Sequence, residues 1–478
     1  MSKVADGSRS MPRGPMHGDR PSPPGRRSIE SLFAAEGIDP LTGAFAGEHS
    51  AHPMMGMRMV APGDVPRLWE EVAATPRTGT GVAYVHIPFC ENHCLFCGFY
   101  QNPWRPELGP AYVDAVLAQL RAGADTPAQN SHPLRAVYLG GGTPTALATG
   151  DLVRLIEGLR RYLPLAADCE ITLEGRVMSF GLDKARAAFD AGVNRVSLGI
   201  QTFEETIRRR LGRKTGRREV IAFLDALVRE DQGAVVIDLI YGLPGQTLDI
   251  FLDDVRAAVA AGVDGLDFYS LKLVPGTPLL TAMDKGKHQP ADRKTLGRYF
   301  AAGWDLAGDL GLEPISTTHW RRTYRERNVY NATVKTGADC LAFGAGAGAS
   351  LAGTSFRLAA GLDDYAGRVR AGECLTSAMV RQSSLAPVLD TVRSGMEHGR
   401  LDADAVDKTL SSLTGDRFEP LAGPLLCQWA AAGLMTRQRN VWLLTLPGRF
   451  WQVAMTSRLI AWIEQEAAPI TRPGDHRS

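Results

Sequence analysis

From residue 81 onwards, the chain alternates between two kinds of hydrophobic pattern. Runs of β-branched and aromatic residues, such as residues 82–87, predict buried strands. Apolar residues at helical spacing, such as Leu152, Leu155 and Leu159, predict amphipathic helices. The expected strands cover residues 82–87, 135–139, 169–173, 195–200, 234–240 and 265–273. The expected helices cover residues 110–122, 151–163, 182–191 and 248–261, and a further helical stretch ends near residue 228.

Strands that alternate with helices predict βαβ units and a parallel sheet, so the fold class is α/β. About six such repeats across residues 81–275 favour a partial (β/α)6 barrel over a closed eightfold one. Barrels of this kind carry their chemistry at the carboxyl ends of the strands. After residue 290 the pattern turns mostly helical, apart from a Gly/Ala-rich strand and loop at residues 338–350.

Composition changes along the chain and suggests where the domains lie. Residues 1–30 contain 14 Gly, Pro or Ser residues and no aromatic residue, which predicts a disordered tail. The remaining divisions are an N-terminal extension that packs on the barrel (31–80), the barrel (81–290), a flanking substrate or cap region (291–374), a mostly helical C-terminal domain (375–465) with a short strand at 441–444, and a tail (466–478).

Charge and cysteine usage narrow the class of protein. The 478 residues include 53 basic and 52 acidic ones, so no strong net field attracts nucleic acid or an anionic membrane. No run of about 18 apolar residues is present, and no membrane span is expected. The odd number of cysteines, seven, argues against a secreted disulfide framework and favours a reducing compartment, so we expect a cytoplasmic protein.

Cys90, Cys94 and Cys97 form a C-x3-C-x2-C motif directly after the first predicted strand. Three thiolates on one loop suit three corners of a [4Fe–4S] cluster, which leaves one iron open to another ligand. Zinc is the competing metal, although it prefers four ligands, commonly as two close pairs. Cys169 and Cys340 are expected to be core thiols.

Other polar and glycine-rich positions follow the predicted strands. Gly140 to Pro144 follow the second strand, Glu174 ends the third, Gln201 follows the fourth, and Asp238 lies in the fifth. Glycines allow a close approach of backbone to a ligand, and carboxylates accept hydrogen bonds from ammonium or ribose groups. The plainer interpretation of each position is a tight turn or a capped, solvated side chain.

Residues 84–90, Tyr-Val-His-Ile-Pro-Phe-Cys, together with Cys94 and Cys97 resemble the radical SAM superfamily, and within it the branch of oxygen-independent coproporphyrinogen III oxidase. The resemblance covers roughly residues 80–350. It implies a radical SAM barrel with a [4Fe–4S] cluster whose open iron binds S-adenosylmethionine, from which a 5′-deoxyadenosyl radical is made. The cysteines are then the catalytic and metal-binding residues. The implied S-adenosylmethionine contacts are Tyr84, Phe96, Gly141, Gly142, Thr143, Glu174, Gln201, Arg213 and Asp238.

Three segments depart from coproporphyrinogen oxidase. Phe99 stands where that enzyme has a further cysteine, Glu174 is followed by Gly-Arg-Val, and residues 325–328 precede a distinct segment at 339–344. These segments, with residues 52–56, resemble the anaerobic haem-degrading radical SAM methyltransferases of the HutW/ChuW type. That resemblance implies an enzyme that opens haem without oxygen, methylates the linear tetrapyrrole and releases the iron.

A haem substrate would need apolar surfaces and cations that bind its propionates. Aromatic candidates for stacking are Phe99, Tyr100, Trp104 and Trp320. Candidate propionate ligands are Arg176, Arg321 and Arg322, and candidate axial or proton-donating groups are His319 and His52. The alternative for each arginine is solvation or ion pairing, and for each histidine a structural role.

Three functions remain open at this point. The first is a radical SAM methyltransferase or oxidoreductase that degrades haem, a porphyrin. The second is coproporphyrinogen III oxidation by propionate decarboxylation, and the third is a chaperone that binds haem and passes it on. For either enzyme, the expected partners are haem or a porphyrinogen as substrate and a flavodoxin or ferredoxin as low-potential electron donor. The complete set of cofactor residues favours an enzyme.

Overall fold

The computed structural model describes residues 26–47 and 57–467, and most of the predicted tails, together with His52, lie outside them. Within these residues the largest element is a curved nine-stranded sheet with the strand order β10-β11-β9-β8-β7-β6-β5-β2-β12. Seven of its strands are parallel neighbours: β12, which is described below, and β2 (Gly81–Ile87), β5 (Leu134–Gly141), β6 (Leu165–Gly175), β7 (Arg195–Gln201), β8 (Ala234–Tyr241) and β9 (Gly265–Ser270). The predicted partial (β/α)6 barrel is thereby confirmed.

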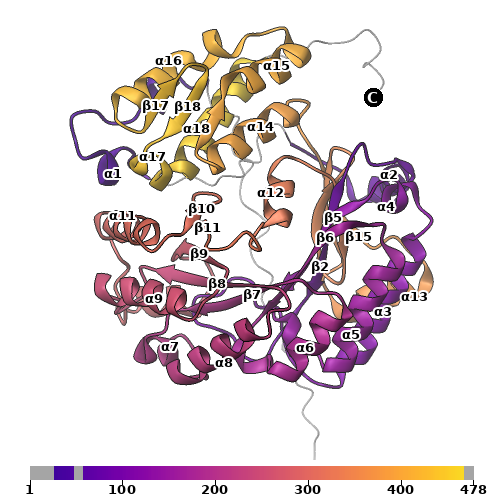
Figure 1. Cartoon of the computed structure of the whole chain (residues 1–478). Coiled ribbons are helices and arrows are strands. Elements are labelled where there is room, and N and C mark those ends of the chain that lie inside the picture. Colours follow the sequence, from indigo (N-terminus) through magenta and orange to yellow (C-terminus); the bar gives the residue numbers. More distant parts are fainter. Residues whose placement is uncertain (1–25, 48–56, 468–478) are drawn as a thin grey trace, which may run out of the picture.

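Helices connect these strands and lie on the convex side of the sheet (Figure 1). They are α3 (Leu108–Gly123), α5 (Thr149–Tyr162), α6 (Leu182–Ala191), α7 (Glu205–Arg210), α8 (Arg217–Arg229), α9 (Leu248–Ala260) and α11 (Arg293–Asp309). Each connecting helix returns the chain to the amino ends of the strands, so the parallel strands all run in one direction. Their carboxyl ends therefore gather at one mouth of the barrel.

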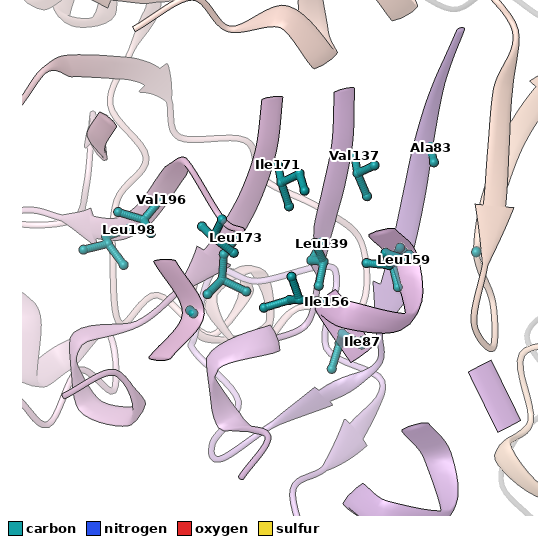
Figure 2. Packing of buried hydrophobic residues seen from close by; sticks show 14 of the residues in the cluster. Ala83, Ile87, Val137, Leu139, Ile156, Leu159, Ile171, Leu173, Val196 and Leu198 are labelled. Carbon is teal, nitrogen blue, oxygen red and sulfur yellow. The ribbon is translucent and has the colours of Figure 1, made fainter. Parts of the chain in front are cut away.

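The packing of α5 shows how the sequence pattern becomes a layer. Ile156 and Leu159 on α5 point towards Val137 and Leu139 on β5, and all four side chains are buried (Figure 2). Each such side chain stabilises the fold by about 1.5–3 kcal/mol when it leaves water. At the ends of α5, acidic Asp151 occupies the first turn and basic residues occupy the last, which complements the helix dipole.

The edges of the sheet differ from the expectation of a mostly helical chain after residue 290. Strand β12 (Cys340–Phe343) extends the sheet in parallel beside β2, and β11 (His319–Arg321) and β10 (Glu313–Pro314) add antiparallel strands beside β9. A separate four-stranded sheet contains β1 (Arg58–Met59), β13 (Gly348–Leu351), β14 (Thr354–Leu358) and β15 (Thr376–Arg381). These strands have two to six residues, too few for a clear period, and they form by pairing with an existing strand.

The last part of the chain forms a second unit with its own hydrophobic cluster, which lies above the barrel in Figure 1. Its elements are α14 (Ala386–Glu397), β16 (Arg400–Asp402), α15 (Ala403–Thr414), α16 (Phe418–Ala431), β17 (Met435–Gln438), β18 (Val441–Leu444), α17 (Leu446–Phe450) and α18 (Gln452–Glu466). The strand expected at 441–444 is present as β18.

The N-terminal extension contacts both units. Helix α2 (Val65–Ala74) buries Val65, Leu68 and Val72 in the cluster that contains the barrel. Leu32 and Phe45, near α1 (Pro40–Gly43), lie instead in the cluster of the C-terminal unit. The domain boundaries given above remain a prediction.

Further α-helices and strands are β3 (Phe89–Cys90), β4 (Asn102–Pro103), α4 (Pro127–Asn130), α10 (Pro278–Asp284), α12 (Val329–Lys335) and α13 (Leu362–Ala371). Among the described residues, none of the helices combines the length and the apolar character that crossing a membrane requires.

Candidate active site

A cavity of about 680 Å³ opens at the carboxyl ends of the parallel strands, where Gly141, Gln201 and Ser270 lie in its wall. Barrel enzymes bind their substrates at this end. The cavity is lined by all three predicted cluster ligands, Cys90, Cys94 and Cys97. It is also lined by every predicted cofactor residue except Tyr84: Phe96, Gly141, Gly142, Thr143, Glu174, Gln201, Arg213 and Asp238. The fold thus brings together residues from five strands and their loops.

Cys90 ends the short strand β3 after β2, Cys94 and Cys97 follow it, and two of the three sulfur atoms receive hydrogen bonds. The Thr143 hydroxyl donates to Cys90 Sγ at 3.4 Å, and the Phe99 backbone N–H donates to Cys97 Sγ at 3.4 Å. Burial raises the pKa of the Cys90 and Cys97 thiols, which therefore keep their protons when no metal is near. A bound metal cation would displace those protons, because a coordinating thiol is deprotonated.

The spacing of these thiols bears on the kind of metal. Within the described part of the chain, no three His, Cys, Asp or Glu side chains are grouped so that they would hold one metal ion. A structural zinc site requires four ligands around one point. In an iron–sulfur cluster each thiolate binds one iron, so three thiolates on one loop suit three corners of such a cluster.

Two buried arginines approach the cysteines. Arg176 donates through Nη1 to the Asn92 carbonyl at 3.4 Å, and the Arg213 guanidinium lies 5.9 Å from the centre of the Phe96 ring. The Nε atoms of both arginines are buried and have no hydrogen-bond partner among the described residues. Burial lowers the pKa of Arg213 to about 10, although the nearby Cys94 opposes this effect. Buried cations with free donors favour an anionic ligand, such as a carboxylate.

The glycines after β5 are required by close approaches. A Cβ on Gly142 would lie 2.5 Å from the Phe89 carbonyl oxygen, and one on Gly141 would lie 2.4 Å from the His86 ring. Gly141 also has φ of +108°, a conformation that side chains rarely adopt. The loop therefore exposes its main-chain groups to the cavity, where a ligand can form hydrogen bonds with them.

Two buried carboxyls complete the inner wall. Glu174 accepts hydrogen bonds from the Tyr138 hydroxyl at 2.8 Å and from the Gly141 backbone N–H at 3.1 Å. Burial raises the pKa of Glu174 to about 7 and that of Asp238 to about 6. A cationic ligand in the cavity would stabilise the ionised form of both groups. Tyr138 was not predicted as a site residue, although strand alternation places it on the same face as Glu174.

Gln201 has an unusual backbone at the end of β7. Its φ is +72°, in the left-handed region that non-glycine residues seldom occupy. A Cβ on Gly199 would lie 2.7 Å from the Gln201 side-chain nitrogen, so the glycine leaves room for this amide. Such strained positions concentrate at functional sites, because the surrounding fold must hold them in place.

The predicted substrate residues are divided between the cavity and other places. Arg176 lines the cavity, whereas His319, Arg321 and Arg322 are not part of its wall. Arg321 pairs with Glu313 at 2.6 Å. Arg322 donates to the carbonyls of Gly262 and Val263. His319 is buried between Ser316 and Tyr269, and burial lowers its pKa. Of the aromatic candidates, Phe99 and Tyr100 line the cavity, whereas Trp320 is buried in the core and Trp104 packs on Phe89.

Tyr84 lies in a neighbouring cavity of about 520 Å³. Its hydroxyl is 2.9 Å from His86 Nδ1, and burial raises its pKa. Phe99 lines both cavities. A ligand at Tyr84 would therefore lie beside one in the larger cavity.

The outer wall of the larger cavity comes from the C-terminal unit, which no sequence motif connected with the site. Its contribution is Arg449, Phe450, Trp451, Gln452, Val453 and Ala454, from the end of α17 and the start of α18. Phe450 packs on Phe300 of α11 with 5.6 Å between ring centres. The C-terminal unit thus closes one side of the barrel mouth.

Known proteins are similar to this chain in sequence or in fold. Residues 84–258 match the family model of the radical SAM superfamily. Anaerobilin synthase of Escherichia coli O157:H7 is 39% identical over 444 residues, which are 91% of this chain and 96% of that protein. The heme chaperone HemW of Bacillus subtilis (strain 168) is 28% identical over 275 residues, 57% of this chain and 71% of that protein. The solved structure of coproporphyrinogen III oxidase (HemN) from Escherichia coli has a TM-score of 0.70 at 23% identity, over 82% of this chain and 92% of that one, a likeness of fold.

Proposed function

The chain belongs to the radical SAM superfamily and is a radical SAM enzyme, and from this premise we propose that it opens haem without oxygen to a methylated linear tetrapyrrole and releases the iron. Membership of the superfamily implies a [4Fe–4S] cluster and S-adenosylmethionine. Together these supply the radical chemistry when they are bound. The protein's own residues then have three tasks: to hold both groups, to orient the tetrapyrrole and to exclude water.

We assign the cluster to Cys90, Cys94 and Cys97. Support comes from their common cavity and from the hydrogen bonds that Thr143 and Phe99 donate to two of the sulfur atoms. Three protein ligands leave one corner of a cubane cluster for another group.

We assign S-adenosylmethionine to the inner part of the same cavity. The carboxyl groups of Glu174 and Asp238 would accept hydrogen bonds from its cationic or hydroxyl groups. The backbone carbonyls of Gly141 and Gly142 would accept hydrogen bonds from its amino group. The free Nε atom of Arg213 would donate to its carboxylate.

The observation that carries the haem assignment is the extent of the similarity to anaerobilin synthase. It covers 91% of this chain, and therefore both the barrel and most of the C-terminal unit. The similarity to the heme chaperone covers 57% of this chain. Phe99, at the position of a cysteine in coproporphyrinogen oxidase, presents an exposed aromatic ring beside the cofactor cavity and supports an apolar, flat substrate.

The test is an anaerobic incubation of the reconstituted protein with haem, S-adenosylmethionine and a low-potential reductant, with flavodoxin or ferredoxin as the proposed physiological donor. We expect the Soret band to decay while free iron and a methylated open-chain tetrapyrrole appear together, as measured by mass spectrometry. The Cys90→Ala variant is the matched control and should leave haem unchanged.

Two outcomes would point to another function. Unchanged haem together with decarboxylation of coproporphyrinogen III would favour the oxidase. Unchanged haem with tight stoichiometric binding, and neither reaction, would favour a chaperone.

A further inference from the structure

We propose that Arg449, on the C-terminal unit, binds a propionate carboxylate of the tetrapyrrole, so that this unit forms the outer half of the substrate site. The inference rests on the proposed function, because it takes haem as the ligand. It gives the C-terminal unit a role in recognition and assigns a propionate ligand that no motif indicates.

The first argument is the position of Arg449. It is the fourth residue of α17 and lies in the wall of the cavity that contains the cysteines, Glu174 and Asp238. A substrate that reaches a radical formed in this cavity must extend through the same opening. A carboxylate bound by Arg449 would therefore lie in the same cavity as the cofactor residues.

The second argument is that Arg449 carries an unpaired charge. Within residues 26–47 and 57–467, neither an ion pair nor a hydrogen bond engages its guanidinium, which lies 4.8 Å from the centre of the Trp304 ring. Burial lowers its pKa, and no acidic group opposes this effect. A cation that is kept half-buried without a counter-ion is costly unless a ligand supplies the anion.

The third argument is that the other candidate arginines have different surroundings. Arg321 pairs with Glu313, and Arg322 donates to two backbone carbonyls. Arg176 and Arg213 line the cavity too, but they lie close to the cysteines: the charge of Arg176 acts to lower the pKa of Cys90, and that of Arg213 acts to lower the pKa of Cys97. Arg449 comes instead from the C-terminal unit, and it is not among the charges that shift the pKa of Cys90 or Cys97.

The fourth argument is the apolar character of the surfaces around Arg449. Phe450, Trp451 and Val453 lie in the same stretch of the cavity wall. On the barrel side, Phe99 is 77% exposed and Val274 is 38% exposed, although both are large hydrophobic residues. Exposed apolar side chains around one opening indicate a binding surface. An apolar opening with an unpaired arginine in its wall matches a flat, apolar macrocycle whose edge carries carboxylates.

The test compares two ligands that differ only at the propionates, haem and haem dimethyl ester. Both are titrated anaerobically into the cluster-reconstituted full chain, and the dissociation constants are read from the Soret band. We expect wild-type protein to prefer haem, and we expect Arg449→Met to reduce this preference by about 10- to 100-fold, the range for one hydrogen bond to a charged group. Affinity for the ester should change little.

Two further variants make the result specific. Arg449→Lys keeps the charge and should retain part of the preference for haem. Arg458→Met is the matched control, because Arg458 is another half-buried arginine of the C-terminal unit, lies over the Phe45 ring at 4.0 Å and is absent from the cavity wall. It should leave the ratio of the two dissociation constants unchanged.

The ratio also separates this inference from damage to the fold. If Arg449→Met weakens both ligands equally, or if wild-type protein binds haem and its ester equally, the propionate assignment is wrong. If wild-type protein neither binds nor opens haem, the proposed function itself fails. An Arg449→Met variant that keeps the full preference while wild-type protein still opens haem would overturn the present inference alone.

Discussion

Some ionisable side chains of the inner cavity are buried, so water does not stabilise their charged forms. The carboxyl of Glu174 is the clearest case, because burial raises its pKa to about 7 from the usual 4.5. An acid with a raised folded-state pKa binds more protons in the folded than in the unfolded protein between those two values. Its contribution to stability is therefore lost as pH rises from about 4.5 to about 7.

We predict that Glu174→Gln removes this loss in the ligand-free protein. The melting temperature of the variant relative to wild type should increase between pH 5 and pH 8, by an amount equivalent to about 1–3 kcal/mol. The same exchange at exposed Glu70 is the control, since it removes no buried carboxyl. A difference between Glu174→Gln and wild type that stays constant across this range would show that the carboxyl ionises normally.

The cysteines give a second prediction at the residue scale. Replacing Cys90, Cys94 or Cys97 by Ala should abolish the iron–sulfur absorption and the reductive cleavage of S-adenosylmethionine. Cys169→Ala is the matched control, because Cys169 is also buried in the barrel but lies outside the cavity wall. Iron analysis after anaerobic reconstitution measures the effect. About four irons per chain in the triple variant would contradict the assignment.

At the scale of elements, one buried ion pair ties the edge of the sheet to its centre. Arg195, the first residue of β7, pairs with Glu326, between β11 and α12, through contacts of 2.8 and 3.0 Å. Gly265 on β9 leaves the space, since a Cβ there would lie 2.7 Å from Glu326 Cγ. The two side chains are 2% and 1% exposed, so solvent cannot replace either partner.

We predict that Arg195→Met lowers the free energy of unfolding by about 3–5 kcal/mol, because it leaves a buried carboxylate without its cation. Adding Glu326→Leu should recover at least half of this loss. Removing the exposed pair partner Arg209, which binds Glu205, should cost about 0.5 kcal/mol or less. Chemical unfolding measures the free energy of unfolding of each variant. If the effects of Arg195→Met and Glu326→Leu were additive, the two side chains would not stabilise each other.

At the scale of the whole molecule, the N-terminal extension joins the C-terminal unit to form one core. The indole N–H of Trp429 donates to the Leu32 carbonyl at 3.2 Å, and that of Trp451 donates to the Pro40 carbonyl at 2.9 Å. Phe45 lies between the two rings, with centres 6.4 and 5.5 Å away. The unit that closes the barrel mouth therefore depends on residues from both ends of the described chain.

We predict that Phe45→Ala loosens the C-terminal unit and leaves the barrel intact. Loss of a buried phenylalanine costs about 3–5 kcal/mol, and here the cost falls on α16 and α18. Hydrogen exchange should rise in those helices and stay unchanged in β5 and β6. Met59→Ala, at a side chain that is 67% exposed, is the control. Equal exchange in both variants would show that the N-terminal segment does not support this core.

The barrel could be predicted because the sequence patterns of its strands and helices each lie within one short segment. Each strand of β2 to β9 in the parallel sheet is a run of apolar residues, and each helix has its own period, so segments such as 182–191 and 195–200 could be placed from the sequence alone. The cysteine motif could be recognised for the same reason, since its three cysteines lie within eight residues. The strand-end rule then predicted that Glu174, Gln201 and Asp238 converge, and all three line the cavity.

Tertiary structure alone decided which cations face that cavity. Arg321 and Arg322 follow an aromatic residue in a suggestive segment, yet the edge strand β11 directs them to Glu313 and to backbone carbonyls. Arg449 lies in an unremarkable stretch, and only the docking of the C-terminal unit brings it to the barrel mouth. Local patterns determine which segments form strands and helices, because those preferences act over a few residues. The partner of a side chain depends on contacts between distant segments, which the fold creates and the sequence pattern does not record.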